Sequence, residues 1–202
     1  MKKTSTLFYL AGAALIGLEG VNLLLGLLEP GSEILWKIQN ILPYLTSIIA
    51  IIIIPIFFMM VMIDNKEYDK CTIATFAITA LYAVLAVFIN LIHLLDFMAW
   101  SGIMNITIPR IFHYAYSLIN NVMFLGFAVH IIAIGLSYRT FVKKYNMLVP
   151  VLASCILLIL SSPWVYAYYI NEYTYMLPDI MYVSAFALLS ISYGIQRNKV
   201  NS

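Results

Sequence analysis

The sequence contains few charged residues. Asp, Glu, Lys and Arg make up 10% of its 202 residues, whereas soluble domains carry roughly 25%. Hydrophobic residues make up 63%. This balance excludes a water-soluble globular protein and predicts a polytopic membrane protein. The formal net charge of +2 is too small to indicate binding to nucleic acid.

Several motifs of well-known enzyme classes are also missing. The chain contains no GxSxG, so it lacks the nucleophile elbow of the serine hydrolases. It has no phosphate-binding glycine loop, which excludes direct use of ATP. Its two cysteines, Cys71 and Cys155, form no CxxC motif. We expect both on the cytoplasmic side of a membrane, where thiols stay reduced.

What the sequence does contain is a series of apolar runs of membrane-spanning length. A hydrocarbon core of about 30 Å needs roughly 20 apolar residues in each helix. We therefore predict an all-α protein with a single membrane domain over residues 1–202. Its six transmembrane helices are expected at about 7–28, 41–63, 71–97, 110–136, 148–170 and 177–195.

The positions of Lys and Arg predict the orientation. With the N-terminus inside, nine of these residues fall on the cytoplasmic side, against Lys37 and Arg110 outside. Because cytoplasmic loops carry the excess of Lys and Arg, we predict a multi-pass protein of the plasma membrane with both termini cytoplasmic. In this topology residues 64–70 are a solvated turn, residues 139–144 a basic loop and residues 197–202 a short polar tail.

The first predicted span has two distinctive faces. Ala13, Gly17 and Gly20 form a stripe of small residues, which lets another helix approach closely. We interpret the stripe as a helix-packing surface, either within the chain or toward a partner subunit. Glu19 and Asn22 lie on a different face. Since a carboxylate inside a span is costly, Glu19 is expected to be paired, protonated or in contact with water.

The segment 90–121 holds most of the polar residues that cannot be assigned to a loop. Asn90, His93 and Asp96 recur at a spacing of three in the predicted span 71–97. In the predicted span 110–136, a second group recurs at spacings of three and four: Arg110, His113, Ser117, Asn120 and Asn121. Each group therefore lies on one side of its helix. With the polar residues of the first span they predict an outward-facing pocket. Its predicted solute-binding residues are Glu19, Asn22, Asn90, His93, Asp96, Arg110, His113, Ser117, Asn120 and Asn121. His130 lies on the opposite face of its helix and is predicted to belong to no cluster.

A pocket of acids, imidazoles and amides suits a small polar or cationic solute. Glu19, His93 and Asp96 would also allow solute binding to be coupled to a proton, because such groups change charge readily with their surroundings. The leading prediction is therefore solute binding or transport, with no cofactor and no catalytic residue.

Two alternatives remain open from the sequence. In the first, the chain is a metal-dependent intramembrane hydrolase, with zinc on His93, Asp96 and His113 and with Glu19 as general base. A haem held by His93 and His113 is disfavoured by the bulky neighbouring side chains. In the second, the chain is a non-catalytic accessory subunit of a membrane complex, and its polar groups pair with one another across helices. The sequence does not decide whether the chain is an enzyme.

Overall fold

The computed structural model describes residues 2–66, 69–105, 109, 114, 125–162 and 176–201. Within these ranges the chain forms helices and no strands, which confirms the predicted all-α class. The elements are α1 (Lys2–Gly26), α2 (Glu33–Asn65), α3 (Lys70–Trp100), α5 (Gly126–Leu136), the π-helical segment η1 (Arg139–Lys144), α6 (Leu148–Leu160) and α8 (Met176–Asn201).

Three helices are long and apolar enough to cross a membrane by length and composition. These are α1 from Ser5 onward, α2 and α3, and they contain the predicted spans 7–28, 41–63 and 71–97 almost completely. The helices α5 and α6 are apolar but shorter. This pattern indicates a membrane protein. Large parts of the predicted spans 110–136 and 148–170 lie outside the described residues, so six spans remain a prediction.

The ends of α2 and α3 follow from local capping. Before α2, the hydroxyl oxygen of Ser32 accepts a hydrogen bond of 3.2 Å from the backbone N–H of Leu35. Asp69 caps α3 in the same way, with its carboxylate 2.8 Å from the backbone nitrogen of Thr72. Such side chains satisfy N–H groups that have no partner within the helix. At its other end α2 stops at Lys66, which adopts a left-handed conformation with φ of 52°.

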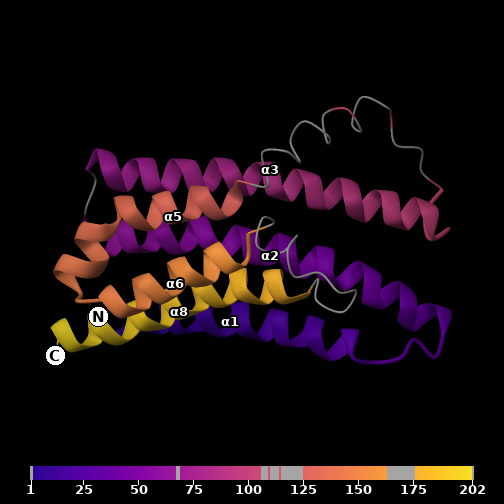
Figure 1. The fold of residues 1–202 in the computed structure, drawn as a ribbon, viewed down its shortest axis with the longest axis horizontal. Coiled ribbons are helices and arrows are strands. Elements are labelled where there is room, and N and C mark those ends of the chain that lie inside the picture. The colour runs from indigo at the N-terminus through magenta and orange to yellow at the C-terminus, as the bar shows by residue number, and fades with distance from the viewer. Residues whose placement is uncertain are drawn as a thin grey trace.

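The helices run alternately up and down and close into a ring. Each of α1, α2, α3, α5, α6 and α8 packs against the next, and α8 packs against α1. Figure 1 shows both chain termini at one end of the bundle. We call this the basic end, because the helix ends and connections there carry most of the basic residues: Lys2, Lys3, Lys66, Lys70, Arg139, Lys143, Lys144, Arg197 and Lys199. We call the opposite end, where α1 and α3 finish and α2 begins, the far end.

The closure of α8 on α1 depends on Gly12. A Cβ atom at this position would lie 2.6 Å from Cγ1 of Ile191 and 3.1 Å from the carbonyl oxygen of Ala187, so only glycine allows this approach. Nearby, the hydroxyl of buried Ser190 donates a hydrogen bond of 2.7 Å to the carbonyl oxygen of Phe8. Hydroxyl-to-carbonyl contacts of this kind join helices where water is absent.

The predicted stripe of Ala13, Gly17 and Gly20 does not take part in this packing. Ala13 and Gly17 are exposed, and the positions where Cβ atoms of Gly17 and Gly20 would lie have no neighbour within 4 Å. Among the described residues, the small residue at which α1 approaches α8 is therefore Gly12. A contact between the stripe and a partner subunit remains a prediction.

Candidate functional site

Five of the ten predicted pocket residues lie in the described structure. Glu19 and Asn22 are in the last two turns of α1, and Asn90, His93 and Asp96 are in the last three turns of α3. All five are partly buried. At a rise of about 1.5 Å per residue, Glu19 and His93 each lie about 10 Å from the end of their helix. The other five, Arg110, His113, Ser117, Asn120 and Asn121, lie outside the described residues.

Asn22 links α1 to α2 through the nitrogen of its side-chain amide. Its Nδ2 donates a hydrogen bond to the hydroxyl oxygen of Thr46, which is buried. The Thr46 hydroxyl has its own acceptors in the carbonyl oxygens of Leu42 and Pro43, each at 3.1 Å. Because that proton is directed at the α2 backbone, the Thr46 oxygen accepts from Asn22 and the amide orientation is fixed.

The remaining atom of that amide, Oδ1, is buried and has no hydrogen-bond partner among the described residues. A buried carbonyl-type oxygen without a donor costs about 1–3 kcal/mol. An incoming N–H group or a cation would remove this cost. Asn22 is therefore a ready acceptor one turn from the carboxylate of Glu19, on the same side of α1.

The α3 residues contact a different face of α2. The ring of His93 stacks on that of Tyr44, with centroids 5.9 Å apart and planes at 20°. Tyr44 and Thr46 are two residues apart, which places them on different faces of a helix. Asn90 bonds within its own helix, from Nδ2 to the carbonyl oxygen of Ala86 at 2.9 Å. Thus Asn22 and His93 contact different faces of α2 in the described structure.

Two of the three predicted zinc ligands, His93 and Asp96, lie in the described part of α3. Within the described ranges no group of three His, Cys, Asp or Glu residues is arranged to hold a metal ion. His113, the third predicted zinc ligand, lies outside those ranges. Zinc on His93, Asp96 and His113 therefore stays a prediction.

The most extensive described polar network lies at the basic end, where the sequence predicted none. Arg197 donates two hydrogen bonds of 2.6 Å to Asp64, from Nε to Oδ2 and from Nη2 to Oδ1. Both side chains are only 7% exposed. The predictions of a merely solvated turn at 64–70 and of a polar tail at 197–202 were wrong for Asp64 and Arg197, because α8 continues to Asn201 and carries Arg197 inward. The other residues of both segments whose side chains the structure describes are polar and exposed, apart from the partly buried Asn65 and the apolar Val200.

Two tyrosines complete this network. The hydroxyl of Tyr193 donates to Oδ2 of Asp64 at 3.0 Å and accepts from Nδ2 of Asn65 at 2.7 Å. The hydroxyl of Tyr145 donates to Oδ1 of Asn65 at 2.8 Å. The predicted basic connection at 139–144 is exposed at Arg139, Lys143 and Lys144, but it is the helical segment η1 and not a loop. It buries Phe141 and leads directly into Tyr145. The two hydrogen bonds between Arg197 and Asp64 connect α8 to α2, and Tyr145 extends this network to the end of η1. We therefore interpret the network as structural.

The prediction that His130 belongs to no cluster was wrong only in that its ring lies among aromatic side chains. His130 is 1% exposed, and its ring makes edge contacts with Tyr82, Tyr182 and Phe186 at centroid distances of 4.8, 5.4 and 4.9 Å. Nδ1 lies 2.7 Å from the carbonyl oxygen of Gly126. Since a carbonyl only accepts, Nδ1 carries the proton.

The position of this histidine depends on Gly126. A Cβ atom there would lie 2.1 Å from the hydroxyl oxygen of Tyr82, so glycine allows the Tyr82 ring to cross α5 beside His130. The ring of His130 is thus enclosed by Tyr82, Tyr182 and Phe186. Gly126 and His130 are four residues apart and lie on one face of α5, but this spacing does not say which side chains pack there.

Comparison with protein-family models, curated proteins and solved structures found no match to this chain.

Proposed function

We propose that this protein binds or transports a small polar or cationic solute at the far end of a six-span bundle in the plasma membrane, with both termini cytoplasmic. The orientation is supported by the grouping of Lys and Arg at the basic end, since cytoplasmic loops carry such an excess. The far end, which is then external, holds Lys37. A solute would enter from the external side.

The observation that carries the proposal is the buried Oδ1 of Asn22, which has no hydrogen-bond partner among the residues that the structure describes. It lies one helical turn from Glu19, in the far half of α1, at a depth where polar groups are costly. A carboxylate and a free amide oxygen together favour a solute that brings hydrogen-bond donors and positive charge. Small ammonium or guanidinium compounds have this chemistry, and neutral polyols provide donors without the charge.

The test is ligand-dependent thermal stability of the purified full-length protein in detergent. A panel of small alkylammonium and guanidinium salts, with neutral polyols for comparison, is added at increasing concentration. A compound present at 100 times its Kd raises the free energy of unfolding by about 2.7 kcal/mol. We expect a cationic compound to raise Tm in the wild type and to lose that effect in Asn22→Leu and Glu19→Gln.

A matched control is available at Gln39. Its amide nitrogen already donates to the carbonyl oxygens of Leu25 and Leu28, at 2.7 and 2.6 Å. Gln39→Leu therefore lowers the stability of the same helix hairpin but keeps the response to the solute. A panel without any effect on the wild type, or an equal response in wild type and Asn22→Leu, contradicts the proposal and favours an accessory role.

A further inference from the structure

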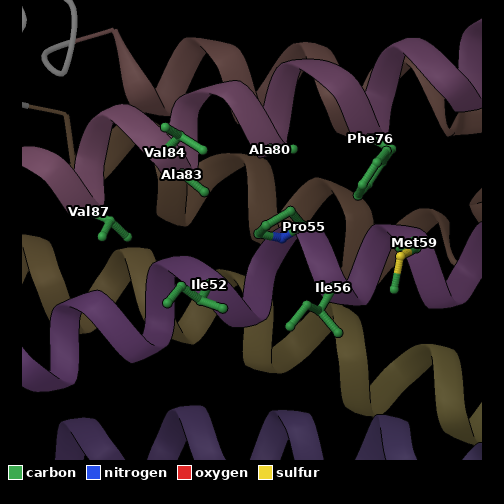
Figure 2. Close-up of a pocket in the computed structure, with 9 residues that line it drawn as sticks. All are labelled: Ile52, Pro55, Ile56, Met59, Phe76, Ala80, Ala83, Val84 and Val87. Carbon is green, nitrogen blue, oxygen red and sulfur yellow. The ribbon is translucent and has the colours of Figure 1, made fainter.

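An apolar groove lies between α2 and α3, near the middle of both helices. Its volume is about 470 Å³. Figure 2 shows the lining side chains, which come from both helices: Ile52, Pro55, Ile56, Met59, Phe76, Ala80, Ala83, Val84 and Val87. The groove exists because Ala80 and Ala83 of α3 stand near Pro55 of α2, and no large side chain fills the space between them.

The groove is accessible from outside the bundle. Ile52 is 43% exposed, Ile56 42% and Val84 67%, whereas Pro55 and Ala83 are buried and form the bottom of the groove. Its lining residues offer no side-chain hydrogen-bond donor, so the ligand is itself apolar along this length. Both helices have the length and composition of membrane spans, which makes a lipid acyl chain the apolar molecule available beside the groove.

Positive charge lies at the basic end of the same two helices. Lys66 follows α2 and Lys70 begins α3, and both are exposed. Glu67 and Asp69 lie between them in the sequence, but the exposed Arg139, Lys143 and Lys144 of η1 give the basic end an excess of positive charge. Counting about 1.5 Å per residue, Lys66 and Lys70 each lie about 10 Å along the helix from the nearest groove residue, Met59 or Phe76. This is the arrangement expected for an acyl chain in the groove and a phosphate at the membrane surface.

The nearby acid Asp69 keeps its own negative charge, and the basic residue that offsets it is Arg139 of η1. Oδ1 of Asp69 accepts hydrogen bonds from the backbone nitrogen and the hydroxyl of Thr72, at 2.8 and 2.6 Å. The carboxylate is thus directed at the start of α3, and Arg139 also interacts with it electrostatically. Clusters of Lys and Arg at the cytoplasmic surface attract anionic lipids.

We propose that the groove between α2 and α3 binds one acyl chain of an anionic phospholipid, whose phosphate lies against Lys66 and Lys70. This lipid site lies apart from Asn22 and Glu19 at the far end and does not depend on the proposed solute. A phosphatidylglycerol is a suitable probe, with the corresponding phosphatidylcholine as a zwitterionic lipid of the same acyl chains.

The experiment counts lipids retained by the delipidated full-length protein in native mass spectrometry. We expect the wild type to retain one phosphatidylglycerol, with a preference of about tenfold over phosphatidylcholine. Ala80→Trp fills the groove and abolishes retention of both lipids. Lys66→Gln with Lys70→Gln removes the preference but not the retention. Two control variants should change neither the lipid retention nor the preference for phosphatidylglycerol. They are Leu81→Trp, at an exposed position of α3 outside the groove lining, and Lys37→Gln, at the far end.

A second measurement uses the wild type only, in case the tryptophan variant does not fold. A phosphatidylglycerol with a photoreactive acyl chain is expected to label peptides that contain residues 52–59 or 76–87. Labelling elsewhere, equal retention in wild type and Ala80→Trp, or an equal affinity for both lipids overturns the proposal. A dimer that forms in place of lipid binding and is lost in Ala80→Trp also overturns it, because the groove is then covered by a second copy.

Discussion

Arg197 binds Asp64 through two hydrogen bonds of 2.6 Å, although the two residues are 133 positions apart in the chain. Asp64 is in the last turn of α2, and Arg197 is in the last two turns of α8. The pair connects the first half of the chain to its C-terminal helix at the basic end (Figure 1). Because both side chains are nearly buried, the pair is shielded from solvent far more than a surface salt bridge.

The first prediction concerns this pair. Asp64→Asn removes the negative charge and leaves the guanidinium of Arg197 buried without its counterion. Removing one partner of a buried pair costs about 3 kcal/mol or more, so the free energy of unfolding should fall by that amount. Unfolding followed by circular dichroism during titration of mixed micelles with a denaturing detergent measures the change.

An exposed pair provides the control. Glu33 and Lys37 form an i,i+4 salt bridge of 2.6 Å, with the Glu33 side chain 76% exposed. Water and salt screen such pairs, so Glu33→Gln should leave stability almost unchanged. If Asp64→Asn is as mild as Glu33→Gln, the Asp64–Arg197 pair does not hold α8 to α2.

The helices could be predicted from the sequence more reliably than the contacts between them. Apolar runs of span length predicted α1, α2 and α3 because a membrane imposes their length and composition. The partner of Asp64 could not be predicted in this way, because it depends on α8 packing beside α1 and reaching the end of α2. Ser190, Tyr193 and Arg197 are spaced by three and four, so they lie on one face of α8. Such a spacing does not say which helix the face contacts.

The candidate site was predicted only in part. The positions of Asn22 and His93 in the far halves of their helices followed from helix periodicity and span limits. The free Oδ1 of Asn22 did not, because it results from the Thr46 hydroxyl donating to its own helix. The cluster around His130 was missed because a close approach at a glycine, here Gly126, has no distinct sequence pattern.

The second prediction compares two glycines of α5. At Gly126 an added methyl group would collide with Tyr82, whereas at Gly135 it would meet nothing within 4 Å. Gly126→Ala should therefore lower Tm clearly, because the rigid tyrosine ring must move away from His130. Gly135→Ala should be neutral or should raise Tm, since alanine favours a helix by up to about 1 kcal/mol over glycine. Equal effects of the two substitutions would contradict the described packing of Tyr82 on α5.

The third prediction concerns acid stability at the start of α3. The hydrogen bonds from the side chain and backbone of Thr72 lower the pKa of Asp69 from its ordinary value. The unfolded chain thus binds this proton more readily than the folded protein. The stabilisation is present above the unfolded pKa and is lost as the pH falls through the folded pKa.

Thr72→Val removes the hydroxyl donor and brings the pKa of Asp69 closer to its ordinary value. The variant should be less stable than the wild type near pH 7, and this difference should shrink as the pH falls from about 6 to about 3. Tm measured across this range tests the expectation, with Asp69→Asn as the control that cannot titrate at this position. A difference between wild type and Thr72→Val that is constant with pH would show that the hydroxyl acts without the Asp69 charge.

The fourth prediction distinguishes the two sets of small residues on α1. Gly12→Leu places a large side chain against Ile191 and the backbone of Ala187, so α1 and α8 must separate and the free energy of unfolding should fall by about 1–3 kcal/mol. Gly17→Leu adds the same side chain where the described structure leaves open space, and its stability should be unchanged or higher. Detergent-denaturation curves of the two variants give the comparison. If Gly17→Leu instead lowers stability as much as Gly12→Leu, the predicted stripe packs within the chain, and α1 is rotated relative to α8.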